Sequence, residues 1–152
     1  MTVTDTKTEE IPSRPLPNSN TDGLRALGFA MVLALLGQLV LGMMNTFWLS
    51  LPESGAGWKA ASPGVLLGSH MMFGTLVLVL AIWIAATAFR RRSRLWLAVS
   101  GVGTLGIVVA FGAGTAFMNS VSNDGASFAM ALGCVLAIAS YAYGLFAAQP
   151  RS

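Results

Sequence analysis

Four long apolar runs constrain this chain more than any other feature of its sequence. They cover residues 24–51, 64–89, 95–118 and 126–148. A helix needs about 20 mainly apolar residues to cross the ~30 Å hydrocarbon layer of a bilayer, so each run is long enough to do so. A water-soluble domain of 152 residues has no use for four such runs. The sequence therefore predicts an all-α, polytopic membrane protein whose fold is a four-helix transmembrane bundle.

Little of the chain remains outside these runs. Of all residues, 55% are apolar and only 10% are charged, which fits a compact bundle without a separate soluble domain. Residues 1–23 are polar and hold too few large apolar side chains to offset the entropy lost on ordering, so we expect a flexible cytoplasmic tail there. Because this polar stretch precedes a long first span, we expect that span to be retained rather than cleaved as a signal peptide. Residues 24–149 are expected to form the transmembrane domain.

The charges predict how the bundle is oriented. Four of the nine basic residues share one short connection: Arg90, Arg91, Arg92 and Arg94. Short loops rich in Lys and Arg stay on the cytoplasmic side, whereas residues 119–125 contain no basic residue and residues 50–63 contain only Lys59. We therefore expect both termini to be cytoplasmic, in a multi-pass protein of the cell membrane, here a bacterial inner membrane. The basic residues that give the net charge of +3 are explained by their role in setting the membrane topology. We therefore expect the partner to be the lipid bilayer and not a nucleic acid.

Polar side chains recur at helical intervals and predict which faces point inward. In the first span, Gln38 and Asn45 are seven residues apart, which is two helical turns. The fourth span repeats this interval through Ser127, Cys134 and Tyr141. Because polar side chains are costly in lipid, we expect these faces to meet inside the bundle. Cys134 is the only cysteine, which excludes the paired-thiol chemistry of small membrane oxidoreductases.

Small residues predict where helices pack closely. Two ridges recur every four positions, one through Gly106, Ala110 and Gly114 and one through Ala129, Gly133 and Ala137. Such ridges let helix backbones approach, either within one chain or against a second copy in a homo-oligomer. Gly101, Gly103 and Gly106 also spell GxGxxG, but this pattern binds dinucleotides only between a strand and a helix. We interpret it here as helix packing.

Soft potential ligands gather in the expected outer half. Six of the eight methionines lie there: Met43, Met44, Met71, Met72, Met118 and Met130. His70, the only histidine, lies about 10 Å below the outer start of its span and leads a stripe through Gly74, Val77, Ala81 and Ile84. Structural roles explain these residues too, because methionine fills gaps and a membrane histidine can hydrogen-bond Asn45, Ser127 or a backbone carbonyl.

Three ligand-based functions remain open from these residues. Haem accepts His with Met as axial ligands, which makes His70 with Met118 or Met130 a candidate haem-binding set. Cu(I) prefers thioether and imidazole ligands, which makes His70, Met44 and Met72 a second candidate set. A small transporter could move protons through His70, although no span carries an embedded carboxylate.

Two segments carry a resemblance to known proteins. GQLVLGMMNTFWLSLP and SHMMFGTLVLVLAIWIAAT, within residues 37–87, resemble one four-helix half of haem A synthase, and the resemblance implies a haem-related role for His70. Phe128 or Ala129 stands where that family's fourth helix has its own histidine. The chain as a whole more closely resembles small four-span bacterial membrane proteins with no assigned activity, through LGMMN, His70 and the SxxMA segment at residues 127–131.

The residues favour a binding or structural role over catalysis. The chain has no motif-spaced Ser, His and Asp set, no HExxH and no embedded carboxylate pair, so we do not expect an enzyme. Our first interpretation is a small accessory or interaction subunit of a membrane complex. The first alternative is a haem-binding or haem-handling membrane protein that uses His70. Cu(I) handling and a role as a small transporter are further alternatives.

Overall fold

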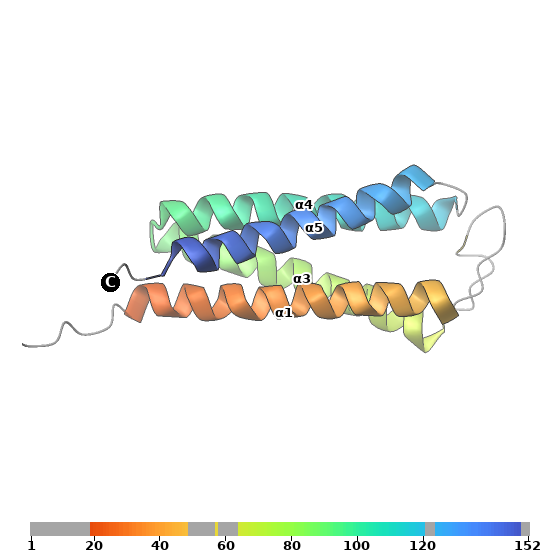
Figure 1. The fold of residues 1–152 in the computed structure, drawn as a ribbon, viewed down its shortest axis with the longest axis horizontal. Helices are drawn as coiled ribbons and strands as arrows, with labels where there is room; N and C mark the ends of the chain where they lie inside the picture. Colours follow the sequence, from red (N-terminus) through yellow and green to blue (C-terminus); the bar gives the residue numbers. More distant parts are fainter. Residues whose placement is uncertain (1–18, 49–56, 58–63, 121–123, 150–152) are drawn as a thin grey trace, which may run out of the picture.

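Four helices make up almost all of the described structure. The computed structural model describes residues 19–48, 57, 64–120 and 124–149. The helices are α1 (Ser19–Trp48), α3 (Val65–Arg90), α4 (Arg94–Asn119) and α5 (Asp124–Ala147), and the described residues contain no strand (Figure 1). Each helix is long and apolar enough to cross a membrane. The prediction of an all-α, four-helix transmembrane bundle is confirmed.

The first helix begins earlier than its apolar run. We predicted a flexible tail over residues 1–23, but α1 already begins at Ser19. The apolar pattern marks the part of a helix that lies in hydrocarbon, whereas the helix itself continues into a polar first turn. Asp22 lies in that turn, where a carboxylate interacts favourably with the positive end of the helix dipole. Residues 1–18 and 49–51, the rest of the predicted tail and the end of the first predicted span, lie outside the described residues.

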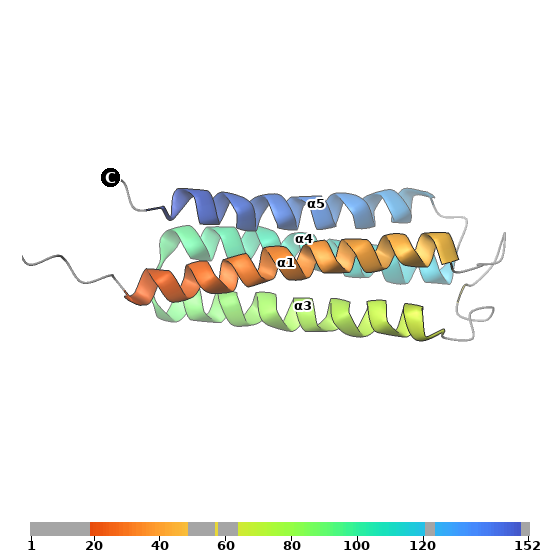
Figure 2. The ribbon, with the colours of Figure 1, turned by 60° about the horizontal axis from the view of Figure 1, so that its bottom comes forward.

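The helices form a ring in which each packs against two others. The order around the ring is α1, α3, α4, α5, and α5 closes the ring against α1 (Figure 2). The start of α1, the end of α3, the start of α4 and the end of α5 share one end of the bundle, which we call the arginine end because it carries Arg90–Arg94. We call the opposite end, where α1 finishes at Trp48, the distal end. The most extensive contact in the ring is between α4 and α5.

Two glycines allow α4 and α5 to approach at backbone distance. A Cβ atom at Gly106 would lie 2.6 Å from the carbonyl oxygen of Gly133, and one at Gly133 would lie 2.5 Å from the carbonyl oxygen of Gly106. The two predicted small-residue ridges therefore pack against each other within one chain. The ridge on α4 ends at Gly114, where the nearest atom to an added Cβ is the Met130 Sδ at 3.4 Å.

The glycine pattern GxGxxG is split between two sides of α4. Gly103 lies directly under the ring of Tyr141, and Gly106 lies against Gly133. Gly101 has nothing within 4 Å of an added Cβ and is exposed. Two of the three glycines thus serve helix packing, as we interpreted the motif, while the third faces outward.

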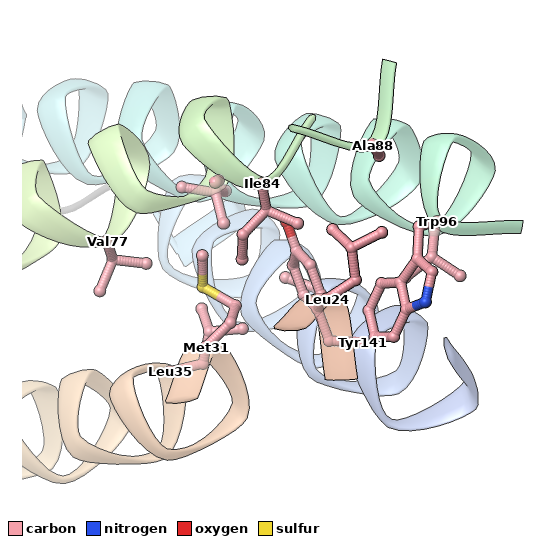
Figure 3. Close-up of a cluster of buried hydrophobic side chains, with 12 residues drawn as sticks. Leu24, Met31, Leu35, Val77, Ile84, Ala88, Trp96 and Tyr141 are labelled. Atoms are coloured by element: carbon pink, nitrogen blue, oxygen red, sulfur yellow. The ribbon is translucent and has the colours of Figure 1, made fainter. Parts of the chain in front are cut away.

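The arginine-end half of the bundle is filled with large side chains. Trp96 and Tyr141 are almost completely buried there, and they pack with Leu24, Met31 and Ile84 (Figure 3). The indole of Trp96 lies over Gly28 and Gly144, which leave room for it. The stripe predicted below His70 points inward as expected, because Val77, Ala81 and Ile84 are all buried.

The outer surface of the bundle is apolar along its length. Large hydrophobic side chains are exposed on every helix, among them Phe29, Trp83, Val108 and Phe146. A water-soluble protein rarely exposes a continuous apolar surface of this extent. Such a surface is compatible with contact to a lipid bilayer, as expected for a multi-pass membrane protein.

Candidate functional site

A cavity occupies the distal half of the bundle. Its volume is about 560 Å³, within the range of small-molecule and cofactor sites. All four helices line it, from Leu35 to Thr46 on α1, Leu67 to Val77 on α3, Ile107 to Met118 on α4 and Ser127 to Cys134 on α5. The large buried side chains thus gather in the arginine-end half, whereas the distal half holds this cavity beside a small buried cluster of Leu67 and Met118.

Small side chains create this space. Gly42 on α1, Gly74 on α3, Gly114 on α4 and Ala131 on α5 all line the cavity. In the other half of the bundle, the inward positions carry large side chains such as Trp96, which fill the interior. Protein interiors normally pack with few voids larger than a water molecule, so a cavity of this size is a candidate binding site.

The residues predicted to bind haem lie around one cavity. His70 on α3, Met118 on α4 and Met130 on α5 all line it. Cys134 and the inward-facing Gln38 line it as well. Three helices thus present the predicted haem ligands to the same space.

The copper set is not brought together. Met44 and Met72 do not line the cavity, and Met72 is 65% exposed on the outer surface. Their neighbours Met43 and Met71 line it instead, because adjacent residues on a helix point about 100° apart. Among the described residues, no group of three or more His, Cys, Asp or Glu side chains could hold a metal ion.

Gln38 and His70 form a polar contact between α1 and α3. The amide nitrogen of Gln38 lies 3.2 Å from Nε2 of His70 and 3.1 Å from the backbone carbonyl oxygen of His70. We call this pair the clasp. Asn45, Ser127 and a backbone carbonyl were the partners expected for His70, whereas its observed side-chain partner is Gln38.

The backbone contact defines the orientation of the Gln38 amide. A carbonyl oxygen can only accept a hydrogen bond, so the amide atom facing it is the NH₂ group. The same NH₂ group then donates its second hydrogen to Nε2 of His70. An imidazole nitrogen that accepts carries no proton, which leaves the proton of neutral His70 on Nδ1.

Two glycines provide the room for the clasp. A Cβ at Gly42 would lie 3.2 Å from Cε1 of the His70 ring, and a Cβ at Gly74 would lie 2.9 Å from the Gln38 amide nitrogen. Each polar side chain therefore lies over a glycine of the opposite helix. In the sequence, Gly42 follows Gln38 by four positions on α1, and Gly74 follows His70 by four positions on α3. This matched spacing is a signal from which the contact could have been predicted.

Asn45 adds a second polar group to the cavity wall. Its amide nitrogen donates to the carbonyl oxygen of Leu41 at 2.9 Å and approaches that of Leu66 at 3.5 Å. Oδ1 of Asn45, Oε1 of Gln38 and Nδ1 of His70 are buried and have no hydrogen-bond partner among the described residues. Buried polar atoms are rarely left unpaired, so these three atoms mark unused hydrogen-bonding capacity.

The cavity wall carries no charged side chain among the described residues. Its polar members are hydroxyl, amide, thiol and imidazole groups, and the rest are apolar. Exposed wall residues occur on every helix, among them Met43 on α1, Met71 on α3, Phe111 on α4 and Ala131 on α5. The cavity is therefore only partly enclosed by the four helices.

Comparisons with protein-family models, with curated proteins and with solved structures found no match. The chemistry of the cavity is therefore inferred from its own residues.

Proposed function

We propose that this protein is a small accessory membrane subunit that binds an uncharged, mainly apolar small molecule in the distal cavity. The observation that carries this proposal is the cavity itself, a space of about 560 Å³ in a bundle whose other half holds a cluster of large buried side chains. A subunit with only a structural role would have no need for a hollow half, because filling it would increase the packing contacts that hold membrane helices together.

The wall chemistry supports an uncharged ligand. A charged group in the membrane interior is costly unless a countercharge lies nearby, and the described wall offers none. An apolar molecule dissolved in the bilayer could enter directly from the lipid, because wall residues such as Met43, Met71 and Ala131 are exposed. These features fit a lipid-soluble ligand that carries a few hydrogen-bonding groups.

Filling the cavity is expected to abolish ligand binding. Gly114→Phe places a ring inside the space, and the nearest obstacle to its Cβ is the flexible thioether of Met130 at 3.4 Å. Gly112→Phe is the matched control, because Gly112 has nothing within 4 Å and does not line the cavity. Organic extraction of the purified proteins followed by mass spectrometry should find a ligand in the wild type and in Gly112→Phe only. Equal recovery from Gly114→Phe would refute binding in this cavity.

Haem is the second candidate, because His70, Met118 and Met130 line the same space. The resemblance to one half of haem A synthase remains a hypothesis that concerns His70 alone. Two observations oppose it: Nε2 of His70 is occupied by Gln38, and the described wall lacks a basic residue to pair with propionates. Oxidised and reduced absorption spectra test this candidate, since a haem held by His70 would show a Soret band that is lost in His70→Ala.

We propose that the arginine end faces the cytoplasm of a bacterial cell. All described Lys and Arg residues lie near that end, and basic residues favour the cytoplasmic side. In a Cys134→Ala background, Ser120→Cys should react with an impermeant thiol reagent in intact cells, whereas Gln149→Cys should react only after lysis. Both positions are exposed, so the opposite pattern would reverse the orientation.

A further inference from the structure

The clasp restricts what His70 can do in the cavity. A histidine binds a metal through a ring nitrogen that carries no proton. In the clasp, that nitrogen is Nε2, and it already accepts a hydrogen bond from Gln38 at 3.2 Å. The other nitrogen, Nδ1, holds the proton, and the ring edge that includes it lies against Gly42. Neither nitrogen is therefore ready to ligate a metal.

Gln38 cannot easily give up this position. Its amide donates to the His70 ring and, at 3.1 Å, to the His70 backbone, so one NH₂ group uses both of its hydrogens on the same residue. Gly74 leaves just enough space for the amide to lie against α3. Hydrogen bonds that join two helices in an apolar surrounding have no water to replace them when they break.

We infer that Gln38 is a positioning residue that holds His70 as the neutral Nδ1–H tautomer and withholds its Nε2 from the cavity. The site then recognises its ligand by packing rather than by a metal bond through His70. Nδ1–H of His70 and Oε1 of Gln38 have no partner among the described residues, but both atoms are buried, so a ligand reaches them only where neighbouring side chains shift. The mode of ligand recognition rests on the proposed function, whereas the tautomer of His70 does not.

The tautomer can be measured directly because the chain has a single histidine. The protein is produced with ¹⁵N-labelled histidine and a tag free of histidine, then studied by NMR in detergent at about pH 8, above the ordinary histidine pKa of about 6.5. Protonated and unprotonated ring nitrogens differ widely in chemical shift, and their couplings to the carbon-bound ring protons identify each one. We expect Nδ1 to be protonated and Nε2 to be unprotonated in the wild type.

Two independent variants should remove this preference. Gln38→Leu deletes the donor, and Gly74→Ala displaces it, because the new Cβ would lie 2.9 Å from the amide nitrogen at the end of a flexible side chain. In both variants we expect loss of the single Nδ1–H tautomer. The matched controls are Asn45→Leu, which removes another polar group of the cavity wall, and Gly68→Ala, at a glycine of α3 with nothing within 4 Å. Both controls should retain the wild-type signals.

A carboxylate at this position gives a sharper contrast. In Gln38→Glu an ionised side chain can only accept, so it should move the proton to Nε2. A wild type with Nε2 protonated would overturn the inference, and so would a tautomer that is unchanged in both Gln38→Leu and Gly74→Ala. These measurements use protein without added ligand, so they remain decisive if the extraction experiment finds no molecule in the cavity.

Added haemin tests the consequence for metal ligation. Breaking the clasp should free Nε2, so Gln38→Leu should bind haemin through His70 about tenfold more tightly than the wild type, the effect of losing about one net hydrogen bond. The double variant with His70→Ala isolates the part of the binding that depends on His70. If the wild type ligates haemin through His70 as tightly as Gln38→Leu does, then Gln38 does not withhold Nε2.

Discussion

Gly106→Leu and Gly133→Leu are each expected to prevent formation of the native bundle. At both positions, the first atom of the new side chain would meet the carbonyl oxygen of the opposite helix, at 2.6 Å and 2.5 Å respectively. A backbone atom cannot rotate away as a side chain can, so α4 and α5 must separate. Overpacking typically costs about 1–3 kcal/mol, and we expect at least the upper value here because the obstacle is backbone.

This result can be measured in detergent-purified protein. Size-exclusion chromatography after stepwise heating should show early aggregation of both leucine variants, if they can be purified at all. Gly112→Leu is the matched control on α4, because nothing lies within 4 Å of its added Cβ and its side is exposed. Native behaviour of Gly106→Leu would mean that α4 and α5 do not pack at backbone distance.

Trp96→Ala is expected to destabilise the arginine-end half strongly. Trp96 is 1% exposed and packs over Gly28 and Gly144, so its removal leaves a large hole between three helices. In soluble proteins such a truncation costs about 3–5 kcal/mol. Part of that cost is transfer from water, which is absent where the alternative surrounding is lipid, so we expect about 2–4 kcal/mol from lost packing.

Trp83 provides a control with the same side chain. It lies on α3 and is 63% exposed on the outer surface, where it has few protein contacts to lose. Trp83→Ala should therefore change the stability by no more than about 0.5 kcal/mol. Reversible denaturation of the two variants by increasing detergent strength compares them directly. Equal effects would show that Trp96 is not the packing centre of this half.

Because the packed core lies in the arginine-end half and the cavity in the distal half, a variant can abolish ligand binding without destabilising the fold. The side chains around Trp96 and Tyr141 are fully buried, whereas the cavity lies beyond Val77 and Ile107 toward the distal end. Variants of the cavity wall such as Gly114→Phe leave the packed half and the glycine contact at Gly106 untouched. We therefore expect loss of ligand in that variant with the fold retained.

Most of the fold follows from local patterns in the sequence. Helix type, number and approximate bounds depend on the length of each apolar run, because every backbone group in a membrane must be satisfied within its own segment. The inward faces could be predicted because polar side chains are costly in lipid, and the positions of Gln38, Val77 and Tyr141 agree with that prediction. The early start of α1 at Ser19 was missed, because polar first turns carry no apolar signal.

The candidate site could be predicted only in part. Its residue types and their common depth are visible in the sequence, and His70, Met118 and Met130 do line one cavity. Met44 and Met72 do not, since their neighbours occupy the inward positions. Gln38 was expected to point inward but was not identified as the partner of His70, although both are followed by a glycine four residues later.

The four membrane-spanning helices and the inward faces of α1, α3 and α5 could be predicted from the chain alone, because both depend on residues close together in the sequence. The backbone contact between α4 and α5, the hollow distal half and the hold of Gln38 on His70 required the folded bundle. These features depend on the rotation and relative height of helices whose contacting residues are 27 to 32 positions apart, as in the pairs Gly106 with Gly133 and Gln38 with His70. A periodic apolar pattern is satisfied by many such arrangements, and the packing of particular side chains selects one of them.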